Sequence, residues 1–225
     1  MAGFTPQLQL ETLFVLNDAG RVVSTREPNP SPGPQFVLIR DGSRCAWAIH
    51  DDVSPELAAQ LDALARCEPA AGDARSEPVY TSRYRTLVPG ELKFGPTFTF
   101  PVGVNSANAV LTVTELAQLT THFRGWTADE LPARSPILAI AEAGSPVSIC
   151  FCARRSGLAA EAGVETAPAF RGRGFAGLVT AAWANAILAS GRLPIYSTSW
   201  SNGPSLAVAR KLGLTTRASV WSLSR

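Results

Sequence analysis

The apolar positions that follow Phe175 repeat with the period of a helix. They fall at Leu178, Val179, Ala182, Trp183, Ala186 and Ile187, which places them on one helical face. Gly191 comes shortly after the last of them, where a glycine commonly ends a helix. Before Phe175, an apolar run over 159–167 is typical of a strand and ends at Pro168. The pattern therefore predicts a strand, a glycine-rich turn and a long amphipathic helix, in that order.

Shorter apolar runs separated by turn residues predict hairpins and further strands in the rest of the chain. The predicted hairpins pair 12–16 with 21–25, 35–40 with 45–50, and 137–142 with 147–154. Further strands are predicted over 79–84, 92–100, 109–113 and 192–200, and helices over 114–123 and 204–212. Ser54 and Pro55 begin another helix, because serine caps a helix and proline suits its first position. The predicted class is α+β, with an N-terminal α+β lobe over 1–106 and a second domain over 107–225.

The composition argues against several classes of partner. Of the 225 residues, 46% are hydrophobic and 17% are charged, which provides enough apolar material for a packed core. The formal net charge of +2 is too small to indicate a nucleic-acid partner. No apolar run approaches membrane-spanning length and no secretion signal is visible at the N-terminus, so no membrane partner is expected.

Cysteine and histidine usage indicates neither a metal site nor a serine–histidine triad. The chain has four cysteines, none at the spacing of metal ligands: Cys45, Cys67, Cys150 and Cys152. A Cys-x-Cys inside an apolar run is more typical of packing than of ligation. Its two histidines, His50 and His122, are far apart in sequence. We therefore expect no metal, and a reducing, cytoplasmic setting.

The turn between the predicted strand and helix is rich in glycine and arginine. It runs Arg171-Gly172-Arg173-Gly174-Phe175-Ala176. Backbone N–H groups at a helix N-terminus have no partner within the helix, and glycine lets a ligand come close to them. The helix dipole and the two arginines favour an anion there, above all a phosphate. The alternative is a tight connection without a ligand, since the turn has neither the Walker nor the Rossmann spacing.

Two ordered motifs in the C-terminal half resemble the GNAT superfamily of acyl-CoA N-acyltransferases. The family loop Gln/Arg-x-x-Gly-x-Gly/Ala matches Arg171 to Ala176. The family's later segment, Asn-x-x-Ala-x-x-Leu-Tyr-x-Lys-x-Gly-Phe, is similar to the stretch from Asn202 to Leu214. The chain departs from the family where a tyrosine often serves as general acid, because Ala209 stands there. The resemblance implies a splayed, mixed β-sheet flanked by helices over 107–225, with acetyl-CoA as cosubstrate and no metal.

The resemblance also implies which residues bind the cofactor. In the family, the strand over 159–167 splays from the next strand, and its free edge hydrogen-bonds the pantetheine arm as an added strand would. Val164 and Thr166 lie on this strand, and Gly163 suggests a bulge or a close backbone approach. The phosphates would meet residues 171–176. Asn202 is expected to contact the cofactor or to hold its loop.

The same strand carries the candidate general bases. Acyl transfer to an amine requires a group that takes the amine proton, and a carboxylate can do so directly or through water. Glu165 and Glu161 have the same parity along the strand, and both are candidates. The alternative is that either one faces solvent or pairs with Arg154 or Arg155.

The transfer also needs a polarised thioester carbonyl and a proton for the departing thiolate. A backbone N–H near Val164 is the candidate to polarise the carbonyl. Because Ala209 has no proton to donate, Tyr196, Ser197 or water is expected to protonate the thiolate.

The sequence thus predicts an N-acetyltransferase that moves the acetyl group of acetyl-CoA directly to a primary amine of a small molecule or peptide. One alternative is a non-catalytic acyl-CoA-binding sensor or pseudoenzyme, which Ala209 in place of tyrosine motivates. Another is a structural protein whose glycine-rich turn holds no ligand. The acceptor amine, the acyl chain and the role of the N-terminal lobe stay open at this point, as does a homodimer.

Overall fold

The computed structural model describes residues 3–101, 103–104 and 110–224 and divides them between two compact units. Unit 1 is formed by Phe100–Tyr196 and Pro204–Thr215, and unit 2 by Gly3–Thr99, Ser197–Gly203 and the residues from Thr216 onward. The predicted domain boundary at residue 106 lies outside the described residues. The last segment groups with the N-terminal residues, so each unit is discontinuous in sequence.

Unit 2 contains a sheet with the strand order β4-β3-β11-β5. The predicted hairpin of β3 (Phe36–Asp41) and β4 (Cys45–Ile49) is confirmed, as is a strand at β5 (Glu91–Thr99). β11 (Thr215–Ser224) pairs antiparallel with β3, a strand from the start of the chain. The sequence analysis missed β11, because its partner is far away in sequence and no local turn signal connects the two strands.

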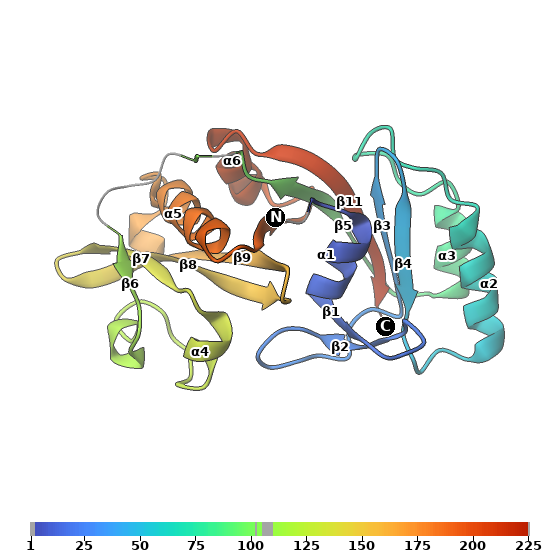
Figure 1. Cartoon of the computed structure of the whole chain (residues 1–225), viewed down its shortest axis with the longest axis horizontal. Helices are drawn as coiled ribbons and strands as arrows, with labels where there is room; N and C mark the ends of the chain where they lie inside the picture. Colours follow the sequence, from blue (N-terminus) through green and yellow to red (C-terminus); the bar gives the residue numbers. More distant parts are fainter. Residues whose placement is uncertain (1–2, 102, 105–109, 225) are drawn as a thin grey trace. The chain divides into compact units, whose positions relative to one another are not determined.

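The side chains of β3 alternate between two apolar layers. Phe36 and Leu38 pack with residues of α2 (Pro55–Arg66) and α3 (Thr81–Leu87), whereas Val37 and Ile39 pack with α1 (Pro6–Leu13). Figure 1 shows α1 on one side of β3 and β4, with α2 and α3 on the other. Unit 2 is therefore a sheet covered by helices on both faces.

The helices of unit 2 confirm one prediction and correct two. α2 begins as predicted, with the Ser54 hydroxyl accepting a hydrogen bond from the Leu57 N–H at 3.3 Å. The strand predicted over 79–84 is wrong, because α3 occupies 81–87 and its Tyr84 stacks on Phe36 at 4.7 Å. α1 includes residues 12–13 of the first predicted hairpin, which is confirmed only over β1 (Phe14–Leu16) and β2 (Val22–Thr25).

Unit 1 contains a mixed sheet with the order β10-β9-β8-β7-β6. The predicted hairpin of β7 (Leu138–Glu142) and β8 (Ser145–Arg155) is confirmed, and β8 pairs antiparallel with β9 (Ala159–Thr166). β9 pairs parallel with β10 (Leu193–Ser197). β6 is limited to Leu111–Thr112, and the start of the strand predicted over 109–113 lies outside the described residues.

β10 ends earlier than the sequence predicts. The predicted strand over 192–200 stops at Ser197, after which the backbone turns toward β5. The N–H groups of Thr198 and Trp200 donate to the carbonyls of Pro96 and Phe94 at 3.3 and 3.2 Å. Gly95 allows this approach, because a Cβ there would lie 1.8 Å from the Thr198 carbonyl oxygen.

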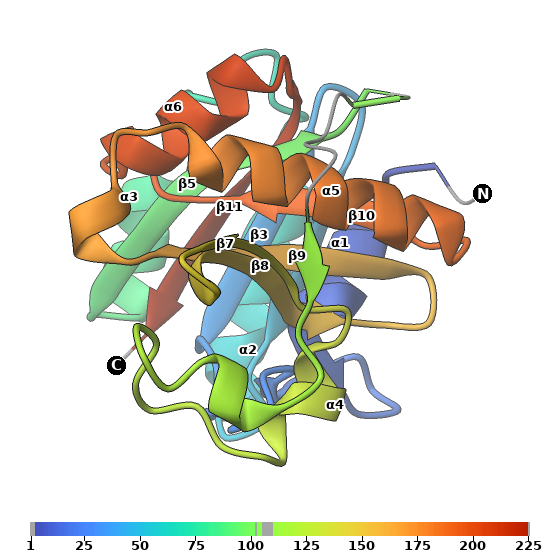
Figure 2. The ribbon, with the colours of Figure 1, turned by 90° about the vertical axis from the view of Figure 1, so that its left-hand side faces the viewer.

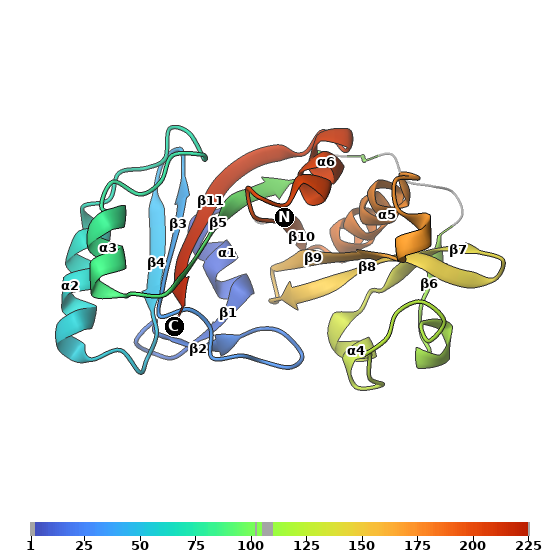
Figure 3. The same ribbon diagram turned by 180° about the vertical axis from the view of Figure 1, so that it is seen from behind.

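The predicted helix α5 (Phe175–Ala189) covers one face of the unit 1 sheet. Its Val179 and Trp183 pack with Cys150 and Cys152 of β8, so both cysteines are core residues, as the Cys-x-Cys pattern indicated. α6 (Gly203–Lys211), also predicted, lies on the same side (Figure 3), and Figure 2 shows α5 beside β8 and β9. The contact between α5 and β8 thus forms the part of the unit 1 core that lies on this face of the sheet.

The opposite face of this sheet is covered by the segment that leads into β7. The continuous helix predicted over 114–123 is wrong, because only a 3₁₀ turn, η1 (Leu116–Gln118), forms there. Glu115 caps this turn together with Gln118, and the chain then continues irregularly to α4 (Glu130–Arg134). Leu119, Phe123 and Trp126 pack with Ile149 and Phe151 of β8. Among the described residues, no helix has both the length and the apolarity to cross a bilayer.

Candidate functional site

β9 is paired along both edges only at its start. Its parallel ladder with β10 joins Leu193, Pro194 and Ile195 to Ala159, Ala160 and Glu161. Beyond Glu161, β9 continues to Thr166 while it keeps its antiparallel partner β8 on the other edge. The predicted splay between the two strands is therefore confirmed, and one edge of β9 is open over 162–166.

The backbone groups at this open edge follow from the β8–β9 ladder. The Ala167 N–H donates to the Val147 carbonyl at 2.9 Å, so this pair is hydrogen-bonded. Hydrogen-bonded pairs alternate with non-hydrogen-bonded pairs along an antiparallel ladder. The backbone N–H and C=O of Glu165 therefore point toward β8, while those of Val164 and Thr166 point toward the open edge. The Thr166 carbonyl does accept a bond from outside the ladder, from the Arg171 Nε at 3.1 Å.

Gly163 serves side-chain packing, and the bulge lies elsewhere. The irregularity in the β8–β9 ladder falls between Cys152 and Arg154, so the extra residue is in β8. Of the two alternatives suggested at Gly163, the bulge is wrong and the close approach to the backbone is confirmed. A Cβ at Gly163 would lie 2.4 Å from the ring of Phe151, the residue directly opposite. Glycine is needed here because the aromatic ring lies too close to the backbone for any side chain.

The loop before α5 presents unpaired backbone donors. Gly172 and Gly174 have φ values of +79° and +86°, and a Cβ at either would meet no atom within 4 Å. Among the described residues, no backbone carbonyl accepts from the N–H groups of residues 172–176, and no side chain caps α5 at Gly174. Open space, free donors and the positive end of the helix dipole together form a site that fits a phosphate group.

The two arginines of the loop have different partners. Arg171 is exposed, and its Nε donates to the Thr166 carbonyl. Arg173 forms a bidentate ion pair with Glu142, the last residue of β7, with one Nη1–Oε2 distance of 3.0 Å. Its guanidinium also lies over the rings of Phe170 and Phe175, at 5.5 and 4.7 Å from their centroids. Sequence analysis missed Glu142, which carries no motif of its own.

Glu165 lies near the open end of β9, on the face away from α5. Although the residue has an exposed surface, its carboxyl interacts with Arg134, Trp126 and Glu130. Burial by these surroundings raises the pKa of Glu165, while the Arg134 charge and a hydrogen bond from Trp126 oppose the rise and the Glu130 charge adds to it. A carboxylate with a raised pKa is a better general base than an ordinary one.

The neighbours of Glu165 form an ordered cluster that the sequence analysis did not identify. Arg134 donates from Nε and Nη2 to Glu130 Oε1 at 3.2 and 3.0 Å, and its guanidinium lies 5.3 Å from the Trp126 ring centroid. Trp126 in turn packs edge-on against Phe151 at 4.8 Å. The available signals were a tryptophan in a polar segment and a Glu–Arg pair four residues apart.

Glu130 is held in its charged form. Burial alone would raise the pKa of its carboxyl, but hydrogen bonds from Thr127 and Arg134 and the Arg134 charge together lower it. The Thr127 N–H donates to Oε2 at 2.9 Å. Glu130 therefore stays ionised beside Arg134 and fixes the arginine.

Glu161 is buried and forms an ion pair. Its side chain is 4% exposed, and Oε2 accepts a hydrogen bond from Arg154 Nη1 at 2.7 Å. Arg154 is the cross-strand partner of Glu161 in the β8–β9 ladder. The two glutamates therefore share one face of β9 but lie in different surroundings, and the ion pair raised as an alternative for Glu161 is present.

The remaining candidates lie around the end of β10. Tyr196 is buried, and its hydroxyl donates to the Ser205 carbonyl at 3.4 Å. Burial raises the pKa of Tyr196, a hydrogen bond with the Ser205 side chain opposes this, and Cys150 adds to it. Ser197 and Asn202 belong to the segment 197–203 of unit 2, in which the Asn202 N–H donates to the Ser199 carbonyl at 3.1 Å. Their predicted roles stay predictions.

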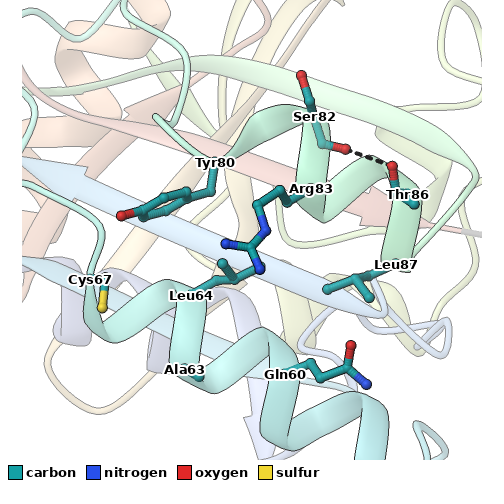
Figure 4. Close-up of a pocket in the computed structure, with 9 residues that line it drawn as sticks. All are labelled: Gln60, Ala63, Leu64, Cys67, Tyr80, Ser82, Arg83, Thr86 and Leu87. Carbon is teal, nitrogen blue, oxygen red and sulfur yellow. Dashed lines mark hydrogen bonds between the residues drawn. The ribbon is translucent and has the colours of Figure 1, made fainter.

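Unit 2 has a pocket between α2 and α3, with a volume of about 520 Å³. Figure 4 shows Leu64 and Leu87 lining its apolar part, with Gln60, Tyr80 and Arg83 around it. None of its lining residues is a carboxylate or a histidine, so the pocket supplies no general base of the kind found at Glu165. Within the described parts of the chain, no three potential metal ligands gather.

A family model described as GNAT acetyltransferase matches residues 138–219. This segment runs from β7 through the open edge of β9, the loop and α5 to β11. Over these residues the chain is similar to the GNAT acetyltransferase family. A search of curated proteins found no match.

Solved structures similar to this chain include a protein of Drosophila, at 15% identity and a TM-score of 0.51, covering 96% of this chain and 85% of that one. A GNAT-family protein of Novosphingobium aromaticivorans has 21% identity and a TM-score of 0.48, with 59% and 64% covered. A GNAT-family acetyltransferase of Colwellia psychrerythraea has 15% identity and a TM-score of 0.47, with 63% and 62% covered. The chain thus spans 64% and 62% of the two bacterial proteins. The Drosophila likeness concerns the fold, a mixed α+β sheet flanked by helices.

Proposed function

We propose that this protein is an N-acetyltransferase that transfers the acetyl group of acetyl-CoA to a primary amine of a small molecule or peptide. One observation carries the proposal: an open strand edge and a loop of unpaired N–H groups follow each other along the chain, with a glutamate of raised pKa on the same strand. The edge and the loop fit an extended, phosphate-bearing ligand. The glutamate supplies a base at its reactive end.

The cofactor would lie along β9 and end at α5. Val164 and Thr166 offer backbone donors and acceptors to the amide groups of a pantetheine arm, as an added strand would. Residues 172–176 offer N–H groups to the phosphates, and the loop adds its two arginines and the helix dipole. Asn202 is proposed to contact the cofactor or to hold its loop. When bound, acetyl-CoA supplies the thioester whose acetyl group is transferred.

Glu165 is proposed as the general base. The attacking amine nitrogen forms a bond to the acetyl carbon, the C–S bond breaks, and the proton lost by the amine goes to the Glu165 carboxylate, directly or through water. The Arg134 charge and a hydrogen bond from Trp126 favour the ionised form of this carboxylate, and a backbone N–H near Val164 would polarise the carbonyl. Glu161 is a weaker candidate because Arg154 already occupies it.

The departing thiolate takes up one proton, and Ala209 has none to give. Burial raises the pKa of Tyr196 above its ordinary value, so its hydroxyl can donate a hydrogen bond but gives up its proton reluctantly. Ser197 or water is the alternative. A thiolate is a fair leaving group, so a weak acid suffices.

The test is calorimetric titration with CoA, followed by acetyl-CoA turnover against a panel of primary amines. We expect binding, and CoA release that depends on the amine. At 100 times its Kd, a ligand that binds only the folded state adds about 2.7 kcal/mol of stability, which a thermal-shift assay would detect. Binding without turnover on any amine would instead support the sensor, and no binding would refute both.

A further inference from the structure

We propose that Glu142 is a built-in competitor for the phosphates of CoA, an intramolecular anion that occupies Arg173 until the cofactor displaces it. The inference rests on the proposed function, since it assumes that the loop at 171–176 receives phosphate groups. It adds a residue outside that loop which sets the affinity for the phosphate-bearing part of the ligand.

Glu142 takes up the side of Arg173 that an anion would use. Nη1 of Arg173 donates to Oε2 of Glu142 at 3.0 Å, and Nη2 donates to Oε1. This is the fork geometry that guanidinium groups also use for phosphate. A phosphate that binds Arg173 in the same way must therefore replace the carboxylate oxygens.

Arg173 is also ordered by its surroundings. The guanidinium lies over Phe175 at 4.7 Å and over Phe170 at 5.5 Å from the ring centroids. These rings fix the plane of the guanidinium, while its side chain is still 47% exposed and that of Glu142 is 36% exposed. The pair is thus both geometrically defined and accessible to a dissolved anion.

The hairpin of β7 and β8 holds Glu142 at this end of the sheet. Glu142 pairs with Ser145 across a turn in which Ala143 and Gly144 have φ values of +48° and +80°. Two residues further, the Val147 carbonyl accepts from the Ala167 N–H, which joins the start of β8 to the end of β9, just before the loop. The carboxylate is therefore placed by the fold rather than by a flexible tail.

Arg171 provides the contrast within the same loop. Its Nε donates to a backbone carbonyl, and no carboxylate pairs with it among the described residues. Arg171 can therefore take a phosphate without losing an ion pair, whereas Arg173 exchanges one anion for another. Removing the Glu142 charge should strengthen the binding of phosphate-bearing ligands alone.

The experiment compares Glu142→Gln with the wild type by calorimetric titration at low ionic strength, using CoA and pantetheine as ligands. An exposed ion pair is worth up to about 1 kcal/mol, so we expect CoA to bind about two- to fivefold more tightly to the variant. Pantetheine, which lacks phosphates, should bind both proteins equally. Glu91→Gln is the control, because it removes the same charge from an exposed ion pair with Lys93 and should change neither affinity.

Arg173→Gln and the double variant complete the test. If Glu142 acts through Arg173, then Glu142→Gln should have no effect on CoA affinity once Arg173 is replaced. Unchanged or weaker CoA binding by Glu142→Gln would overturn the inference while leaving the proposed function intact. Failure of the wild type to bind CoA would refute the proposed function itself, so the two failures are distinguishable.

Discussion

The two ends of strand β9 differ in how many of their edges are paired, although both ends carry a glutamate on the same face. At the start, Ala160 and Glu161 pair with β8 on one edge and β10 on the other, and Glu161 forms a buried ion pair with Arg154. At the far end, Val164 to Thr166 pair only with β8, and Glu165 lies beside Trp126 and Arg134. The first half of β9 is therefore paired along both edges, whereas its second half has one open edge.

This difference teaches that strand pairing, rather than residue type, separates a carboxylate held in a buried ion pair from one beside an open strand edge. Where both edges of a strand are satisfied, a glutamate becomes part of the packing and needs a permanent counter-ion. Where one edge is open, backbone donors and a carboxylate remain accessible to a ligand. The loop extends the open end, because the free N–H groups of residues 172–176 follow it along the chain.

The largest expected effect comes from exchanging the Glu165 carboxylate for an amide. Glu165→Gln keeps the size of the side chain but removes its basicity, so turnover should fall by about 10²–10⁴, with CoA affinity unchanged. The loss should be greatest at low pH and shrink as rising pH deprotonates the amine in solution. Steady-state kinetics across pH, with calorimetry for CoA, measures both.

Glu161→Gln is the matched control at the closed end. It should lower stability, by about 1–3 kcal/mol in urea unfolding, because Arg154 loses its charged partner, while turnover of the folded protein changes little. Full activity of Glu165→Gln together with a catalytic loss in Glu161→Gln would reverse the comparison. Full activity of both variants would leave positioning and solvent proton transfer as the mechanism.

The next effect concerns the loop that continues the open end. Gly174→Asp places a side chain and a negative charge at the N-terminus of α5, where we expect a phosphate. CoA affinity should fall about 10- to 100-fold, as measured by calorimetry. Gly191→Asp is the matched control, since Gly191 follows the other end of α5 with a φ of +80° and no atom within 4 Å of an added Cβ. Equal affinity losses in the two variants would mean that strain, rather than charge at the loop, weakens binding.

A smaller effect is expected from Trp126→Phe. The Trp126 hydrogen bond lowers the pKa of Glu165 against the raising effect of burial, so its loss should raise that pKa further. The base acts only when deprotonated, so the acidic limb of kcat/KM should move to higher pH. At low pH the rate should fall about fivefold, the equivalent of about 1 kcal/mol, and recover at high pH. An equal loss at every pH would show that Trp126 supports only the packing on Phe151.

The smallest effect is expected from Tyr196→Phe. The hydroxyl already donates to the Ser205 carbonyl, and losing one such bond costs about 0.5–1.5 kcal/mol of stability. Turnover should stay within about threefold of the wild type, with unchanged CoA affinity. A large drop in kcat would instead assign Tyr196 the proton-donating role that Ala209 cannot fill.

The sequence by itself determined the elements whose signals are local. The strand, loop and helix from 159 to 189, the β7–β8 hairpin, the cap of α2 and the GNAT motifs were all readable from spacing and turn residues, because each depends on neighbours within a few positions. The same spacing placed the two candidate glutamates on one strand face.

The tertiary structure decided which partners the predicted segments and the candidate site residues have. β11 becomes a strand between β3 and β5, the segment at 81–87 becomes a helix because Tyr84 packs on Phe36, and Gly163 is required by the ring of Phe151 across the ladder. Arg154 forms an ion pair with Glu161, and Glu142 forms one with Arg173. Trp126 interacts with Glu165 from a segment to which the sequence analysis assigned no role. These contacts join residues far apart in the chain, and no local preference encodes such pairings.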